Sequence, residues 1–362
     1  MTRGRSAWVS RAMISAVERG RHLPGLEVLL TLSQVLHIAP TEVLERLELA
    51  RARSIETAGL SWDELDRKAS ESFWAGDPRT AVACYEAMLR MLQQDPPPDD
   101  RQRTRLVATT ELRRGSALRR CGATAAARAG IERAIAIADG IPEIQVEGYL
   151  VLTALLIQLG CLPLARDAAA RSVELADECG TAKLRGWAWI EKGQVLHASG
   201  RPAEALDAFR QAREWVREAE DHAHAVKVEG NIGACFCDLG RYEQARRRYL
   251  DAVELARKHR QPASEAFWLL EVGRVGYLQE RLDQADSYAQ ASLRIAKPKE
   301  LLLTCFRGEW LRHLVQRARH PGDRDRHRVA YLKKLFVRLE EHRGIEEIQE
   351  FKRAYGSTSR GR

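Results

Sequence analysis

Long apolar runs are missing from this sequence of 362 residues. No stretch approaches the roughly 18 consecutive apolar residues that a membrane-spanning helix needs, so no membrane partner is expected. The N-terminus is basic and lacks the apolar segment of a secretory signal peptide. The seven cysteines are odd in number and scattered, which favours reduced thiols over a disulfide framework. We therefore expect a cytoplasmic protein.

Motifs that carry chemistry are missing as well. The sequence has no glycine-rich phosphate loop, no nucleophile elbow and no carboxylate pair with an identifiable catalytic role. His222 and His224 have no further ligands at metal-ligand spacing. Cys235 and Cys237 are two residues apart, which places them on different faces of a helix. We expect that the protein is not an enzyme and has neither a metal site nor a cofactor.

A pattern that recurs every forty residues organises the chain. Gly200–Ala212 and Gly240–Ala252 both read G-x4-A-x3-[FY]-x2-A. The same positions recur, with weaker matches toward the N-terminus, at Ala81/Tyr85/Met88, Ala127/Ile131/Ala134, Ala165/Ala169/Ser172 and Ala285/Ala289/Ser292. Self-similarity at a fixed period is typical of stacked helical repeats. A generic helical bundle, the alternative, would not explain the repeated step of forty.

Glycines recur in the same frame. Gly193, Gly233 and Gly273 each precede an anchoring alanine by twelve residues, in the middle of a predicted first helix. A mid-helix glycine costs about 1 kcal/mol relative to alanine, so its recurrence predicts close packing against the second helix. The pattern resembles the tetratricopeptide repeat (TPR). This resemblance implies an all-α protein, a TPR-like α-solenoid of about six helix pairs.

Local signals divide the remainder of the chain. We assign residues 1–50 to a partial helix-turn-helix head, 51–64 to a helical linker, 65–298 to the repeats and 299–362 to a helical C-terminal cap with a basic tail. Ser61 and Glu64 predict a capping box at the first repeat. The segment around Pro96–Pro98 cannot continue a helix, and it predicts a loop or a domain hinge.

The head carries a different kind of sequence. Ser10, Ile14, Ser15, Glu18 and Gly20 form S-x3-I-S-x2-E-x-G, followed by two further short helical segments. This stretch resembles the helix-turn-helix of lambda-repressor/Cro-like (XRE) regulators. The resemblance implies binding to double-stranded DNA, as a homodimer because one recognition helix reads few bases. The residues expected to face DNA bases or phosphates are Ser10, Arg11, Ala12, Ser15, Arg19 and Arg21.

The head is shorter than the XRE domain. Two helices normally precede the segment that matches Val9, and only eight residues stand there. One hypothesis is that the true start codon lies upstream. The other is that the head is a relic that does not bind DNA.

The first helices of the repeats are expected to line a concave groove. Asn231 is the only asparagine in the chain, and an amide among aromatic and charged groups suits an extended peptide. The groove residues predicted are Trp187, Gln194, His197, Lys227, Asn231, Phe267, Glu271, Arg274 and Tyr277. The alternative for Trp187 and Phe267 is packing between repeats.

Two functions follow from these patterns. The first is a DNA-binding transcriptional regulator of the XRE type whose repeats sense a peptide, a small ligand or a protein partner. The second is a TPR scaffold for protein–protein interaction that does not bind DNA.

Overall fold

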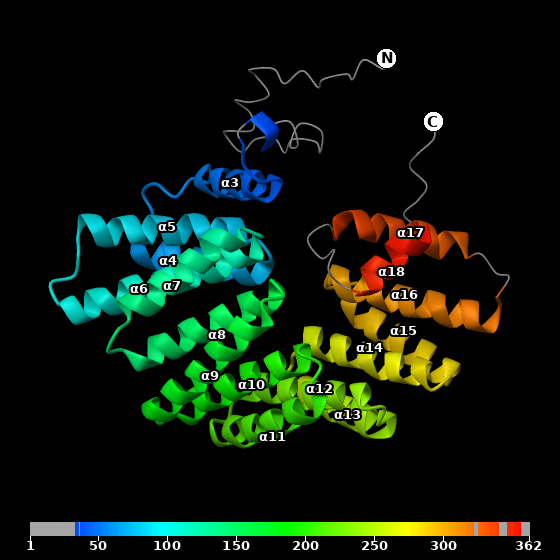
Figure 1. The fold of residues 1–362 in the computed structure, drawn as a ribbon. Helices are drawn as coiled ribbons and strands as arrows, with labels where there is room; N and C mark the ends of the chain where they lie inside the picture. Colours follow the sequence, from blue (N-terminus) through cyan, green and yellow to red (C-terminus); the bar gives the residue numbers. More distant parts are fainter. Residues whose placement is uncertain (1–32, 36, 322–324, 340–345, 356–362) are drawn as a thin grey trace, which may run out of the picture. The chain divides into compact units, whose positions relative to one another are not determined.

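The computed structural model describes residues 33–35, 37–321, 325–339 and 346–355, and its regular elements there are all helices (Figure 1). The chain divides into two compact units, residues 1–180 and residues 181–362, each of which is described separately. The division falls after Gly180 and not at the proline-rich segment. None of the helices in these ranges is long and apolar enough to cross a membrane. Ser10, Arg11, Ala12, Ser15, Arg19 and Arg21 lie outside the described residues.

The described part of the first unit contains the helix α3 and three helix pairs. Its helices are α3 (Pro40–Arg53), α4 (Trp62–Ala75), α5 (Pro78–Gln94), α6 (Asp100–Arg120), α7 (Thr124–Ile137), α8 (Pro142–Gln158) and α9 (Leu162–Cys179). The predicted capping box is confirmed, because Ser61 and Glu64 bond reciprocally at the start of α4. Residues 54–61, which the sequence assigned to a helical linker, form turns and irregular backbone. The loop predicted around Pro96–Pro98 separates α5 from α6.

The second unit contains three further pairs and a terminal group of helices. Its helices are α10 (Ala182–Ala198), α11 (Pro202–Glu218), α12 (His222–Asp238), α13 (Tyr242–Lys258), α14 (Pro262–Leu278), α15 (Leu282–Ala296), α16 (Leu302–Arg319), α17 (Arg326–Arg338) and α18 (Glu346–Tyr355). Helix α16 packs on both α14 and α15, and α17 and α18 pack on α16. The described part of the chain is therefore an all-α, TPR-like solenoid with six helix pairs, as predicted.

The repeating residues form the interior of each pair. Every residue of the six triplets that define the forty-residue pattern is buried, with at most 4% of its surface exposed. Gly200 and Gly240, which open the pattern, adopt a φ of 71° at the turn between helices. This left-handed conformation favours glycine because it lacks a Cβ. The sequence pattern therefore identifies both the residues buried between helices and the glycine at the turn that joins them.

The mid-helix glycines lie against the second helix of their own pair. A Cβ at Gly193 would stand 2.6 Å from the Phe209 ring, and one at Gly233 would stand 2.8 Å from the Tyr249 ring. These distances are shorter than real Cβ contacts. The close packing predicted from the glycine spacing is confirmed.

Helix α3 is attached to the first repeats by side-chain contacts. The Glu45 carboxylate accepts hydrogen bonds from the Thr124 hydroxyl and the Ala125 backbone N–H, both at 3.0 Å. These donors lie at the N-terminus of α7, where unpaired N–H groups and the helix dipole favour an anion. Glu48 also forms an ion pair with Arg79 of α5. Polar contacts therefore tie α3 to two different repeats.

Candidate peptide-binding pocket

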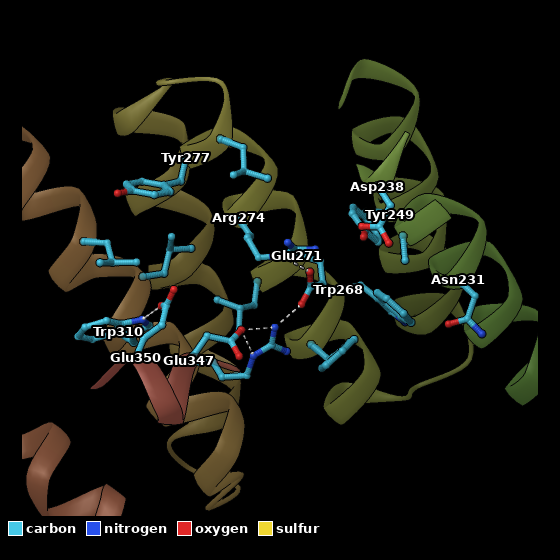
Figure 2. Close-up of a pocket in the computed structure, with 17 residues that line it drawn as sticks. Asn231, Asp238, Tyr249, Trp268, Glu271, Arg274, Tyr277, Trp310, Glu347 and Glu350 are labelled. Atoms are coloured by element: carbon cyan, nitrogen blue, oxygen red, sulfur yellow. Dashed lines mark hydrogen bonds and ion pairs between the residues drawn. The ribbon is translucent and has the colours of Figure 1, made fainter. Parts of the chain in front are cut away.

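A pocket of about 550 Å³ lies in the second unit, between α12, α14, α16 and α18 (Figure 2). Tyr249 of α13 reaches it from behind the first helices. Its wall combines aromatic rings with ionisable groups and one amide. The aromatic residues are Tyr249, Phe267, Trp268, Tyr277 and Trp310. The polar residues are Asn231, Asp238, Glu271, Arg274, Arg307, Glu347 and Glu350.

Successive first helices supply equivalent positions to this wall. Asn231 of α12 and Glu271 of α14 are forty residues apart, and so are Phe267 of α14 and Arg307 of α16. Helix α16 therefore occupies the place of a further first helix. The repeat geometry aligns these side chains along one groove, as expected for stacked repeats.

A buried carboxylate lies at the centre of the pocket. Glu271 Oε2 accepts from Arg274 Nε at 2.7 Å, and its Oε1 accepts from Arg307 Nη2 at 2.7 Å. Arg307 Nε also donates to Glu347 Oε1 at 2.7 Å. Figure 2 shows these groups converging between α14, α16 and α18. The network joins three helices and fixes the orientation of both guanidinium groups.

Burial and ion pairing act in opposite directions on these groups. Burial alone would raise the pKa of Glu271, but Arg307 and Arg274 outweigh it and leave that pKa below its ordinary value. The same carboxylate overcomes the effect of burial on Arg274 and raises its pKa. The ionised states of the two partners therefore stabilise each other.

Aromatic rings form one wall of the pocket. The Tyr249 and Trp268 rings stack with centroids 5.7 Å apart, and the Phe267 ring meets Trp268 edge-on at 4.6 Å. A Cβ at Gly230 would stand 2.1 Å from the Trp268 ring. Trp268 can occupy this place only because residue 230 has no side chain. Phe267 and Trp268 thus both contact neighbouring helices and line the pocket.

Asn231 provides a free hydrogen-bond donor at the edge of this wall. Its Nδ2 is buried and has no hydrogen-bond partner among the described residues. A buried amide N–H without a partner costs about 1–3 kcal/mol, and a ligand carbonyl would remove this penalty if the Asn231 side chain turned toward the pocket. In Figure 2, Asn231 and Trp310 lie at opposite ends, with the Glu271 network between them. An elongated ligand can therefore contact both ends.

The structure brings five of the nine predicted groove residues together and leaves four outside the pocket. Asn231, Phe267, Glu271, Arg274 and Tyr277 line it. Trp187, Gln194, His197 and Lys227 do not line it.

Trp187 Nε1 donates to Asp221 Oδ2 at 2.9 Å. Lys227 Nζ pairs with Glu191 at 3.3 Å. With the Gln194 amide oriented so that its oxygen faces Lys227, this oxygen accepts from Lys227 Nζ at 2.7 Å. His197 Nε2 lies 2.8 Å from Asp238 Oδ2. These four residues connect neighbouring repeats.

Sequence reasoning missed several pocket residues. Tyr249 was assigned to repeat packing alone, and Arg307, Trp310, Glu347 and Glu350 were assigned to the cap. A signal for two of them was present, because Arg307 and Trp310 continue the forty-residue register of Phe267 and Leu270. Within the ranges that the structure describes, no group of three or more His, Cys, Asp or Glu side chains is arranged to hold a metal ion.

Comparison with known proteins identifies the repeats. Residues 184–258 and 224–297 match the sequence model of the Tetratricopeptide repeat family. The second unit therefore contains tetratricopeptide repeats, and its pocket is lined in part by them. A search of curated proteins found no match.

Solved structures with a similar fold include a gene regulator, a phosphatase and a protein with a tetratricopeptide repeat sensor. The Rap conjugation gene regulator of the plasmid pLS20, in complex with the Phr* peptide, superposes with a TM-score of 0.58 at 17% identity, covering 96% of this chain and 93% of that one. Aspartyl phosphate phosphatase F from Bacillus subtilis gives 0.57 at 13% identity, covering 97% and 88%. A Signal Transduction ATPase with Numerous Domains (STAND) protein with a tetratricopeptide repeat sensor, from Pyrococcus horikoshii, gives 0.54 at 14% identity.

This chain spans about half of that STAND protein, with coverage of 84% of this chain and 47% of the other. At these identities the likeness shows the fold alone.

Proposed function

We propose that this protein is a peptide-responsive regulator whose second unit binds an extended peptide in the pocket and whose head binds double-stranded DNA. The observation that carries the peptide part is the unpartnered Asn231 amide beside aromatic rings in a pocket of about 550 Å³. The similar Rap fold in complex with the Phr* peptide adds support. Peptides bound in extended form offer backbone carbonyls and side chains, which an amide donor and aromatic rings recognise.

The DNA part rests on the XRE signature in the head. Its recognition residues are Ser10, Arg11, Ala12, Ser15, Arg19 and Arg21. Helix α3 (Pro40–Arg53) contains the last residues of the head, and it is bonded to the repeats through Glu45 and Glu48. A DNA-reading head that ends in this helix would be mechanically connected to the repeats, and two copies would read two half-sites.

Peptide binding is tested with the full chain and a mixed library of unmodified hexapeptides. Bound peptides are captured on the immobilised protein and counted by mass spectrometry. Asn231→Ala removes the amide donor and is expected to lower capture about tenfold, the equivalent of one lost hydrogen bond to a buried group. Gln93→Ala, an exposed amide residue on α5, is the matched control and should bind like wild type. Equal capture by both variants would reject this site.

DNA binding is tested by titrating the same protein with random-sequence duplex DNA at rising salt. We expect affinity to fall steeply with salt because arginine contacts release counterions. Replacing Arg11, Arg19 and Arg21 together by alanine should remove most of the binding, whereas replacing the exposed Arg210 should not. A version extended upstream in frame serves as a comparison in the same titration.

A scaffold that binds peptide or protein without DNA is the second candidate. The likeness to solved structures that contain a tetratricopeptide repeat sensor or bind a peptide supports it. Peptide capture without DNA binding by either the given or the extended chain would select the scaffold. We also propose that neither unit is an enzyme, and a turnover assay of captured peptides would test this.

A further inference from the structure

The pocket carries more negative than positive charge. Four carboxylates line it, from Asp238, Glu271, Glu347 and Glu350, against the guanidinium groups of Arg274 and Arg307. The net formal charge of this wall is therefore negative. A ligand that complements it should bring positive charge, since charge complementarity selects among binding partners.

The two guanidinium groups are already paired with carboxylates. Arg274 Nε donates to Glu271, and Arg307 is shared between Glu271 and Glu347 at 2.7 Å to each. Glu271 is 5% exposed. An anion that displaced either guanidinium from Glu271 would leave this carboxylate with fewer partners in a buried place, which is strongly unfavourable. The network therefore offsets the positive charge of both arginines.

Two of the pocket carboxylates have fewer partners than the arginines. Glu350 Oε2 accepts from Trp310 Nε1 at 3.1 Å, and among the described residues no cation pairs with it. At the other side of the pocket, Asp238 is half exposed and has His197 as its only ion-pair partner in the described ranges. A carboxylate with a single neutral donor can accept further hydrogen bonds from an ammonium or a guanidinium group.

Aromatic rings lie at the same end as this carboxylate. Figure 2 shows Tyr277 and Trp310 at the end where Glu350 lies. Trp310 is 3% exposed and its ring stacks on His313, so it contributes its Nε1 donor to Glu350 and not an open face. The Tyr277 ring is partly exposed, and the face of an aromatic ring attracts a cation within about 6 Å. This ring, together with a carboxylate that has no cation partner among the described residues, forms a site for a positively charged side chain.

We propose that the pocket selects a basic peptide, with an arginine or lysine side chain bound to Glu350 beside the Tyr277 ring. The Asn231 amide then donates to a backbone carbonyl of the same peptide at the opposite end. This assignment rests on the proposed function, because it specifies the peptide that the pocket receives.

The test uses three hexapeptide libraries that differ only at one fixed residue, which is arginine, alanine or glutamate. Each library is captured on the full wild-type chain, and capture is quantified by mass spectrometry. We expect the arginine library to be captured about tenfold better than the alanine library and the glutamate library to be captured least. Loss of the arginine preference at high salt would agree with a charge effect.

Two substitutions assign the preference to one carboxylate. Glu350→Gln keeps an acceptor for Trp310 Nε1 and removes the charge, so it should reduce the arginine preference about fivefold or more. Glu350→Lys should favour the glutamate library. Glu254→Gln, an exposed carboxylate on α13 outside the pocket, should behave like wild type. Circular dichroism of each variant checks that the helices remain.

The outcomes separate this inference from the proposed function. Equal capture of the three libraries, with capture still dependent on Asn231, would overturn the charge assignment and leave peptide binding intact. An arginine preference that survives in Glu350→Gln would overturn the role of Glu350. No capture of any library would overturn both proposals.

Discussion

The two units satisfy their buried polar groups in different ways. In the described part of the first unit, the buried polar side chains are hydroxyls that bond within their own segment, as Thr110 does to Leu106 O and Thr153 does to Tyr149 O, both at 2.7 Å. In the second unit the buried set includes Glu229, Glu271, Glu309 and His313. Each of these residues has at least one partner outside its own helix, such as Arg307 for Glu271 and Tyr355 for His313.

This difference separates two kinds of interior in the part of the chain that the structure describes. A hydroxyl bonded to its own helix makes no demand on neighbouring helices. A buried carboxylate needs partners at fixed positions on those helices, because an unpaired buried charge is very unfavourable. Glu309, for example, lies 2.7 Å from Lys297 and 3.3 Å from Arg328. The helices around the pocket are therefore constrained by charge as well as by shape.

The largest expected effect comes from removing the central carboxylate. Glu271→Ala leaves the half-buried Arg274 and the more deeply buried Arg307 with one partner fewer each, and should lower the free energy of unfolding by about 3–5 kcal/mol. In the first unit, Thr110→Val should lower it by about 1 kcal/mol because only one local hydrogen bond is lost. Urea unfolding followed by circular dichroism measures both. Equal losses would mean that the two interiors do not differ in this way.

A smaller effect is expected from filling a glycine contact. Gly230→Ala places a methyl group 2.1 Å from the Trp268 ring, and the displacement of that ring should cost about 1–3 kcal/mol. Gly130→Ala in α7 is the control, because its Cβ would meet its nearest atom at 3.6 Å. This control should be stabilised by up to about 1 kcal/mol, since alanine favours the helix. If Gly230→Ala left the free energy of unfolding unchanged, the Trp268 ring would be easily displaced.

The smallest expected effect is a pH dependence confined to the second unit. Burial lowers the pKa of His313 below 6.5, and Arg317 and Arg328 lower it further. The folded state then binds its proton less readily than the unfolded state. The contribution to stability is present above about pH 6.5 and is lost as the pH falls through the folded pKa.

A substitution isolates that contribution. His313→Gln offers a polar group to the Tyr355 hydroxyl, which lies 2.7 Å from His313 Nε2, but does not titrate. Between pH 7 and 5 the wild type should lose more stability than the variant, as measured by thermal unfolding at each pH. Parallel losses would assign the dependence to other groups, such as His224, whose pKa burial also lowers.

The sequence predicted the fold well because one physical constraint repeats. Close approach of two helices requires small residues at regular positions, so Ala205, Ala245 and Gly233 identify the packing surface directly. The end of the repeats was harder to place, since α16 continues the register through Arg307 and Trp310 without the alanine pattern that follows a first helix. Its groove positions carry different residue types from those of α14, although α16 occupies the same place in the stack as a first helix.

The site was predicted only in part, for a different reason. A groove position can hold either a ligand-facing residue or one that pairs with the next repeat, and spacing does not distinguish them. Trp187 and Lys227 share the register of Phe267, yet Trp187 bonds to Asp221 and Lys227 to Glu191. Trp268 was missed because its role depends on the absence of a side chain at Gly230, a contact between helices that no local pattern reveals.

The pocket is lined by residues from several successive repeats, and this has an evolutionary consequence. Stacked-repeat proteins change length by gaining or losing whole repeats, because each repeat contacts only its neighbours. In this chain the pocket spans residues from α12 to α18, so a repeat duplicated after α13 would separate Asn231 from Glu271 and its arginine partners. Variants of different length would keep the fold and lose the site. Selection for ligand binding would therefore preserve the number of repeats between α12 and α18, while the remaining repeats are free to vary in number.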